Sequence, residues 1–361
     1  MAGPKNASKS AGTFRFYDWP NAESPDEPYR LLSVTSIRKL CGEPYQLVAW
    51  QINNVINVAM GTTGRVKVGP RGGRSKVYLL DGEFPGPFLS RLLAAEGKQS
   101  GLDSTRAWLR ETADKPRDTA AARGTIVHEA IEIGASLDMI DQRYVELAVG
   151  RLSPRDQKKM KAGVTEEDVV FVRDCIANYW DMRVNVPFVM LAREPQVFNL
   201  AQGYGGSADA LFWFLPEGTP LAEIKHWQGL ADKRLVDLAL VEKEGGHVCL
   251  GDWKTSKGVY TDHVLQVTGY MCAEFVGADG VIDQRLTELL IASSEAAIVH
   301  IRPNGWTVDF ADWREDAARA FFGSVAMARF LAHHEKPFDL FTHRIKGRAP
   351  DTTTAEEEDE D

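Results

Sequence analysis

The stretch His247-Val248-Cys249-Leu250-Gly251-Asp252-Trp253-Lys254 decides how this chain is interpreted. Apolar residues dominate it, and its length predicts a β-strand. Positions two apart in a strand face the same side of the sheet, so Asp252 and Lys254 project together while Trp253 faces the other side. We therefore take Asp252 and Lys254 as a candidate acid–lysine pair.

An acid-x-lysine triplet carries no information by itself. Average composition produces roughly two or three of them by chance in a chain of this length. This sequence has four, at Glu96–Lys98, Asp156–Lys158, Glu223–Lys225 and Asp252–Lys254. Only the last two fall in the strand-rich region, and the motifs around Asp252–Lys254 favour it. We expect Glu223–Lys225 to lie in a surface hairpin inserted between strands.

Strands and helices are predicted on both sides of this stretch. Phe188–Leu200 and Tyr204–Phe214 are strand-like, and the turn at Gly203–Gly206 makes them a hairpin. The order helix, three strands, helix, strand is typical of a mixed α/β core with a central sheet flanked by helices. Further helices are expected at 103–113, 120–135, 166–184, 262–276 and 311–333, and further strands near 288–302 and 305–310.

Composition along the chain predicts four regions. Residues 1–27 are polar and are expected to be disordered. We expect a mainly helical N-terminal region at 28–117, an α/β core at 118–349 and an acidic, disordered tail at 350–361.

Charge is unevenly distributed along the chain. The formal net charge is −9, but residues 351–361 hold seven acids and no base, and without them the rest would carry −2. The Gly- and Arg-rich stretch 61–77 is predicted to be a mobile basic loop. It offers candidate DNA-binding residues, and an exposed, solvated loop explains it equally well. The candidates are Arg65, Lys67, Arg71, Arg74 and Lys76.

The remaining composition indicates a globular protein outside membranes. No stretch approaches the ~20 apolar residues of a membrane span, and the expected compartment is the cytoplasm. The cysteines are far apart and form no CxxC pair, so we interpret them as buried small hydrophobic residues. They are Cys41, Cys175, Cys249 and Cys272.

Four motifs occur in a specific order. They are Gly124-Thr125-Ile126-Val127-His128-Glu129, Gly205-Gly206-Ser207-Ala208-Asp209, Gly251-Asp252-Trp253-Lys254-Thr255-Ser256-Lys257, and Gln266 with Tyr270. This series resembles the motifs of RecB-like exonucleases of the PD-(D/E)XK nuclease superfamily, over roughly residues 118–302. It is similar to phage-encoded members related to the CRISPR-associated exonucleases, and Leu32–Ile37 is a looser match to their amino-terminal segment.

The resemblance implies a restriction-endonuclease-like core and a metal site. His128, Asp209, Asp252 and the backbone carbonyl of Trp253 would bind Mg²⁺ or Mn²⁺, and Lys254 would be the catalytic lysine. Gln266, Tyr270 and Glu194 would have supporting roles, with Gln266 and Tyr270 positioning Lys254 or the DNA backbone. The iron–sulfur cluster of some relatives is not expected, because Cys272 is the only cysteine after Lys254.

These residue types suit phosphodiester hydrolysis. A hard divalent cation held by oxygen ligands polarises the phosphate and lowers the pKa of an attacking water. A lysine adds positive charge where negative charge develops in the transition state.

Each residue also has a structural interpretation. His128 could be an ordinary core or surface histidine, and Tyr270 could be ordinary core. Asp209 and Asp252 could form structural salt bridges. Glu132, one turn after His128, could support it or simply be exposed.

The resemblance implies a DNA nuclease, an exonuclease acting in recombination, repair or phage DNA metabolism. Its partner would be DNA with ends, together with a recombination or single-strand-binding protein. Two alternatives stay open: a restriction-like endonuclease on the same core, and a non-catalytic DNA-binding scaffold. The sequence contains no GxxxxGK[ST] motif, which excludes a helicase of that kind in this chain.

Overall fold

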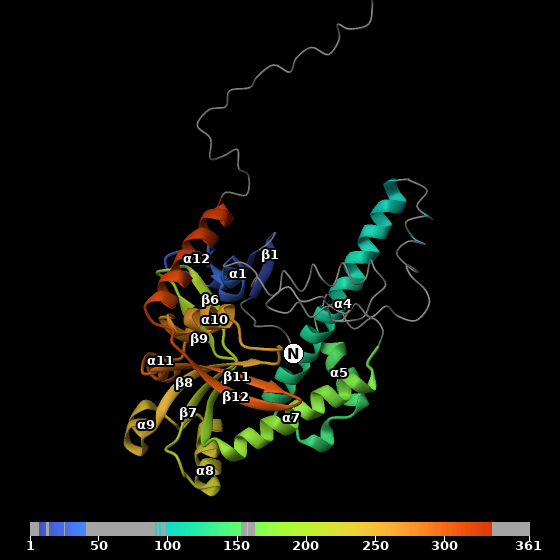
Figure 1. Ribbon diagram of the computed structural model, residues 1–361. Coiled ribbons are helices and arrows are strands. Elements are labelled where there is room, and N and C mark those ends of the chain that lie inside the picture. Colours follow the sequence, from blue (N-terminus) through green and yellow to red (C-terminus); the bar gives the residue numbers. More distant parts are fainter. Residues whose placement is uncertain are drawn as a thin grey trace, which may run out of the picture.

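The structure is a computed structural model of the chain, and it describes residues 7–11, 14–24, 26–40, 99–152 and 163–333, together with 91, 94 and 157. This part folds as an α/β protein with two mixed sheets and helices around them (Figure 1). The helices are α1 (Val34–Leu40), α4 (Gln99–Glu132), α5 (Gln142–Arg151), α7 (Glu166–Asn185), α8 (Leu221–Asp232), α9 (Leu238–Glu244), α10 (Thr261–Met271), α11 (Gln284–Ile291) and α12 (Asp316–His333), with a 3-10 turn at Leu137–Met139.

A five-stranded sheet, counted over the described residues, carries the stretch that opened the sequence analysis. Its order is β12-β11-β8-β7-β4. Strand β8 is antiparallel to β7 and parallel to β11, so the sheet is mixed. The strands are β4 (Phe188–Arg193), β7 (Ala210–Phe214), β8 (His247–Lys254), β11 (Glu295–Arg302) and β12 (Gly305–Ala311).

Alternation along β8 divides the core into two layers. Val248 and Leu250 belong to a cluster shared with α10 and α12, whereas Cys249 and Trp253 belong to a cluster shared with α4 and α7. Helices therefore cover both faces of this sheet, which explains why β8 is almost continuously buried.

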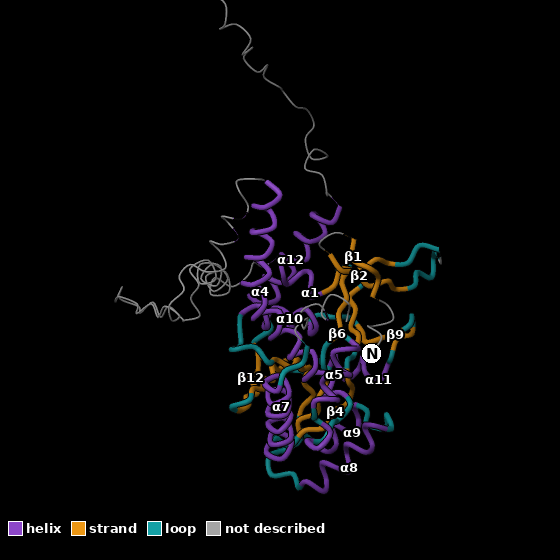
Figure 2. The backbone as a smooth tube through the Cα atoms, turned by 90° about the vertical axis from the view of Figure 1, so that its right-hand side faces the viewer, coloured by secondary structure: helices purple, strands orange, loops and turns teal. Residues whose placement is uncertain are grey.

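A second sheet of seven strands, again within the described residues, has the order β1-β2-β3-β6-β5-β9-β10. Strand β3 pairs parallel with β6, with Leu32 beside Tyr204, so the amino-terminal strands join the body of the protein. Helices α1, α10 and α12 pack on one another next to this sheet (Figure 2). The strands are β1 (Ala7–Ala11), β2 (Phe14–Trp19), β3 (Tyr29–Ser33), β5 (Gln196–Asn199), β6 (Tyr204–Ser207), β9 (Phe275–Ala278) and β10 (Val281–Ile282).

The amino-terminal part differs from the sequence-based expectation. Residues 1–27 were expected to be disordered, but 7–11 and 14–19 form β1 and β2, and Tyr17 and Trp19 are buried. Separate helices were expected at 103–113 and 120–135, but α4 is continuous and crosses the expected boundary between residues 117 and 118. The basic loop 61–77, most of the expected helical region and the acidic tail lie outside the described residues.

The strand region differs in four places. The stretch expected as one strand at 188–200 is two strands in different sheets, β4 and β5. The stretch expected as one strand at 204–214 is likewise two strands in different sheets, β6 and β7, with Asp209 between them. Glu223–Lys225 lies in helix α8 and not in a hairpin. Residues 284–291 are helix α11, so the strand expected from 288 begins at Glu295.

No helix in the described ranges is both long enough and apolar enough to cross a membrane.

Candidate active site at the end of strand β8

Strand β8 presents Asp252 and Lys254 on one face, as their spacing predicted. Asp252 is 1% exposed, and its carboxylate forms an ion pair with the Lys254 ammonium. Trp253 faces the opposite layer, where its ring packs edge-on against Tyr179 of α7 and Phe212 of β7. The buried indole fixes the register of β8, so the two charged side chains must face α10.

Helix α10 meets this pair with an amide and a phenol. Gln266 Nε2 donates to Asp252 Oδ1 (3.1 Å) and to Tyr270 Oη (2.8 Å). Gln266 Oε1 accepts from Lys254 Nζ (3.3 Å). Gln266 and Tyr270 are one helical turn apart and share a face, which places both over β8. The interpretation of Tyr270 as ordinary core is therefore incomplete: the side chain is buried, but its hydroxyl belongs to this network.

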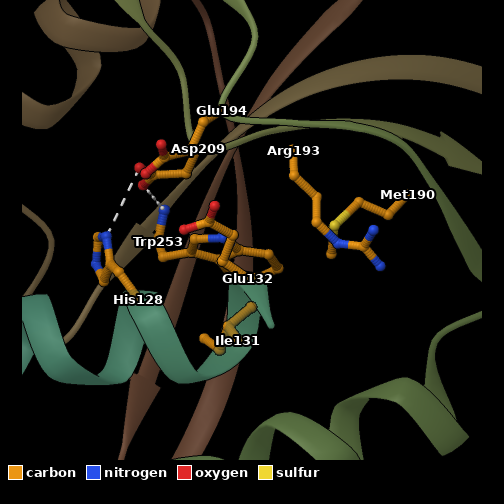
Figure 3. A pocket seen from close by; sticks show the side chains of 8 residues that line it. All are labelled: His128, Ile131, Glu132, Met190, Arg193, Glu194, Asp209 and Trp253. Carbon is orange, nitrogen blue, oxygen red and sulfur yellow. Dashed lines mark hydrogen bonds and ion pairs between the residues drawn. The ribbon is translucent and has the colours of Figure 1, made fainter. Parts of the chain in front are cut away.

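His128 and Asp209 form a second pair beside β8. His128 Nδ1 lies 3.6 Å from Asp209 Oδ1, and Asp209 Oδ2 accepts a hydrogen bond from the backbone N–H of Trp253 (2.7 Å; Figure 3). Helix α4 carries His128, and the β6–β7 connection carries Asp209. The Trp253 amide thus links this pair to the strand that holds Asp252 and Lys254.

The four groups influence one another electrostatically. Burial raises the pKa of Asp252 to about 6, and the charge of Asp209 adds to this while Lys254 opposes it. Burial would also raise the pKa of Asp209, but His128 and Lys254 outweigh it and lower that pKa. For His128 burial favours the neutral ring, yet Asp209 prevails and the pKa is raised. The site therefore holds one acid charged and keeps the other near its titration midpoint at mildly acidic pH.

A pocket next to His128 and Asp209 contains two further acids. Glu194 lies beside Asp209, and Glu132 points toward them from α4 (Figure 3). Burial, then Glu194 and Glu129, raise the pKa of Glu132 to about 7. Burial and Asp209 raise the pKa of Glu194. Ile131, Met190, Arg193 and Trp253 complete the lining.

Two motif glycines allow the elements of the site to approach one another. A Cβ at Gly206 would lie 2.7 Å from the Tyr270 ring, and a Cβ at Gly124 would lie 2.7 Å from Thr255 Oγ1. Real Cβ atoms essentially never come that close. The first glycine lets β6 pack against α10, and the second lets α4 pack against the residues after β8.

The candidate donors are of the types that a divalent metal ion uses, but they do not surround a common point. Among the described residues, no three His, Cys, Asp or Glu side chains stand close enough together to enclose an ion. The donor chemistry still fits a hard divalent cation, because it consists of carboxylate oxygens, an imidazole and a backbone carbonyl. Asp252 Oδ2 is buried against the Lys254 ammonium. A metal ion bound to Asp252 would share this carboxylate with Lys254.

The competing triplet has none of these surroundings. Glu223 and Lys225 are exposed on α8, and positions two apart on a helix point in different directions. The Glu223 carboxylate accepts a hydrogen bond from the indole N–H of Trp227, at 3.4 Å. Glu96–Lys98 and Asp156–Lys158 lie outside the described residues.

Most of the candidate residues meet in one place, and one neighbour was missed. Arg38 of α1 donates to Gln266 Oε1 from 228 positions upstream, and no local pattern predicts such a contact. The sequence allowed Glu132 either to support His128 or to be an exposed surface residue. In the structure it lines the pocket next to His128. Glu129 is buried and paired with Arg151 (2.8 Å). The DNA-binding candidates Arg65, Lys67, Arg71, Arg74 and Lys76 lie outside the described residues.

A scan against protein-family models finds no match to this chain, and a search of curated proteins finds no matching sequence. The function is therefore inferred from the site and from the motifs that carry the resemblance.

Proposed function

We propose that this protein is a metal-dependent DNA nuclease with a restriction-endonuclease-like core, acting as an exonuclease. One observation carries the proposal: Asp252 and Lys254 project together from the end of a buried strand, beside the Asp209–His128 pair and under Gln266. Stability alone does not explain a buried ion pair, because apolar residues of similar volume often stabilise a protein equally well in its place.

The order of elements supports the proposed core. Helix α7 is followed by β4, β7 and β8, then by α10, and then by β11, which returns parallel to β8. With the other elements left out, this order agrees with the succession of helix, three strands, helix and strand; in the chain, β5 and β6 stand between β4 and β7, α8 and α9 stand between β7 and β8, and β9, β10 and α11 stand between α10 and β11. It places the acids at one end of the five-stranded sheet, where side chains from α4 and α10 converge on them.

His128, Asp209 and Asp252 are the side chains that would hold Mg²⁺ or Mn²⁺, with the Trp253 carbonyl as a further oxygen. The bound cation would polarise the phosphate and activate a water. Asp209 is prepared for this role by the pKa shift that keeps it charged.

Lys254 supplies positive charge beside the reacting phosphate. Its ammonium is shared between Asp252 and Gln266 and is mostly shielded from solvent, with 14% of the side chain exposed. A cation in such surroundings stabilises developing negative charge more strongly than one in water. Gln266 limits where the ammonium can go, and Tyr270 holds Gln266.

The alternatives predict different behaviour. A restriction-like endonuclease would cut covalently closed circular DNA, whereas an end-dependent exonuclease would not. A DNA-binding scaffold needs no buried carboxylates near the phosphate, and Asp252 is such a group. The proposed partners, DNA with ends and a recombination or single-strand-binding protein, follow from the resemblance alone.

The test is DNA degradation with Mg²⁺ or Mn²⁺ and with EDTA, on linear and on closed circular substrates. We expect the wild type to degrade linear DNA only, and only with metal. Asp209→Ala and Asp252→Ala should lose about 10²-fold or more in rate, since each removes a charged group at the reacting phosphate. Cutting of closed circles would favour the endonuclease, and inactivity on every substrate would favour the scaffold.

A further inference from the structure

Helix α1 brings one basic side chain into the candidate site from the amino-terminal part of the chain. Arg38 Nη1 donates to Gln266 Oε1 at 2.8 Å and forms an ion pair with Asp262 Oδ2 at 3.5 Å. Asp262 and Gln266 lie one turn apart on α10, so Arg38 lies against one face of that helix. Its side chain is 21% exposed, and the residue is therefore partly shielded from solvent.

The Gln266 amide has neighbours of two kinds. Its oxygen can only accept, and it faces two cations, Arg38 and Lys254. Its nitrogen can only donate, and it faces the Asp252 carboxylate and the Tyr270 hydroxyl. Lysine and arginine have no acceptor and an ionised aspartate has no donor, so only this orientation satisfies both ends.

Arg38 makes the shorter of the two contacts to the amide oxygen, 2.8 Å against 3.3 Å for Lys254. Lys254 is also engaged by Asp252, so its hold on the oxygen is divided. Gln266 is 8% exposed, and an amide oxygen left unpaired at that depth would be costly. Arg38 is therefore the main restraint on the oxygen end of the amide.

We propose that Arg38 is a positioning residue of the site: it fixes the Gln266 amide so that the amide holds Asp252 from one end and Lys254 from the other. As far as it concerns catalysis, this rests on the proposed nuclease function. Arg38 acts on Asp252 and Lys254 through Gln266.

The fold explains how so distant a residue reaches the site. Strand β3 pairs parallel with β6, and α1 follows β3 directly and packs on α10 and β6. The same β6 leads toward Asp209. The position of Arg38 therefore depends on the docking of the amino-terminal segment. Helix α1 holds Arg38 next to Gln266 only when β3 is paired with β6.

The experiment compares Arg38→Gln and Arg38→Lys with Asp262→Asn. The Asp262 variant is the matched control, because it removes the ion pair between α1 and α10 but leaves the contact with Gln266. The first readout is the side-chain amide signal of Gln266 in ¹⁵N NMR spectra of the full chain, identified by its loss in Gln266→Ala. We expect this signal to be protected from hydrogen exchange in the wild type and in Asp262→Asn, and to shift and lose protection in Arg38→Gln.

The second readout is steady-state DNA cleavage. Arg38→Gln should lower kcat by about 10- to 100-fold, as is usual when the group that orients an active-site residue is removed, with a smaller change in KM. Arg38→Lys should recover part of the loss, because one donor remains, and Asp262→Asn should stay close to wild type.

An unchanged Gln266 signal in Arg38→Gln would overturn the proposal, as would equal losses of rate in Arg38→Gln and Asp262→Asn, which indicate only a structural tie between α1 and α10. If Arg38→Gln does not fold, the Gln266 signal of Arg38→Lys decides the matter: it should shift, and an unchanged signal would refute the proposal. If the wild type cleaves no DNA but the signal responds as expected, the nuclease function fails and the positioning role stands.

Discussion

Glu194 is held in a backbone conformation that costs free energy. Its φ is +47°, in the left-handed region that non-glycine residues rarely adopt. Its backbone N–H donates to the carbonyl of Asp209 at 3.0 Å, so the strained residue is tied to the chain that carries a candidate ligand. Strain of this kind persists only where the surrounding structure enforces it, and it is frequent at functional sites.

Glu194→Gly should therefore raise the free energy of unfolding by about 1 kcal/mol. Relief of the left-handed strain, about 1–2 kcal/mol, outweighs the extra freedom of glycine in the unfolded chain, about 0.5–1 kcal/mol. Urea denaturation measures the change. Glu315, with φ +45° on the exposed surface, is the matched control. Both variants should be more stable, but only Glu194→Gly should lower nuclease activity; a less stable Glu194→Gly would contradict the interpretation.

At the residue scale, the sequence predicts the relative positions of side chains that are only a few residues apart in one strand or helix. Asp252 with Lys254 and Gln266 with Tyr270 follow from the two-residue period of a strand and the four-residue period of a helix. Arg38 could not be predicted, because its contact with Gln266 depends on how two distant segments pack. The strain at Glu194 was also hidden, because nothing in Arg193-Glu194-Pro195 requires a positive φ.

Among the elements, α7 is the one whose beginning is most clearly specified. Thr165 and Asp168 form a capping box, in which each side chain meets the backbone of the other. Asp168 Oδ1 also accepts from Arg123 Nε at 2.6 Å, so the start of α7 is tied to α4 five residues before His128. Burial would raise the pKa of Asp168, but hydrogen bonds from Thr165 and then from Arg123 outweigh burial and lower that pKa.

Asp168→Asn should destabilise the protein at neutral pH by about 1–3 kcal/mol, since it removes a charged acceptor from a nearly buried position. A lowered pKa means that the stabilisation is present above the unfolded pKa, near 3.9, and is lost as the pH falls through the folded value. The gap between wild type and variant should therefore shrink below about pH 4. Urea unfolding at several pH values measures it, with the exposed Glu167→Gln as control. A gap that is constant with pH would contradict this role.

Element boundaries were predicted less well than element types. Helix α7 and strand β8 were predicted because their patterns are long and regular. The break at Asp209 was missed because Ala208, Ala210 and Leu211 are all apolar and conceal the passage from one sheet to the other. Helix α8 was mistaken for a hairpin although Ile224, Trp227 and Ala231 recur at helical spacing.

At the scale of the whole molecule, the amino-terminal strands belong to the fold. Trp19 is 5% exposed and packs on Phe198 and Phe275, with ring centroids 4.7 and 5.0 Å away. These rings come from β2, β5 and β9, so the cluster joins parts of the chain more than 170 residues apart. The expectation of a disordered segment failed because these few aromatic residues are diluted by polar neighbours in the sequence.

Trp19→Ala should cost about 3–5 kcal/mol of unfolding free energy, the usual loss for a buried large aromatic residue. Chemical denaturation measures it, with Tyr29→Ala as the control because that side chain is 41% exposed. An unchanged stability in Trp19→Ala would show that the amino-terminal strands are not docked, and would also remove the basis for the delivery of Arg38.

The most direct test of the central claim compares two lysines that share a triplet but not a site. Lys254→Met and Lys225→Met are assayed for degradation of linear DNA with Mg²⁺ or Mn²⁺, alongside the wild type. We predict that Lys254→Met loses about 10²- to 10³-fold in rate, because positive charge is missing at the reacting phosphate, and that Lys225→Met matches the wild type. Full activity of Lys254→Met in a metal-dependent wild-type background would contradict the assignment of the active site.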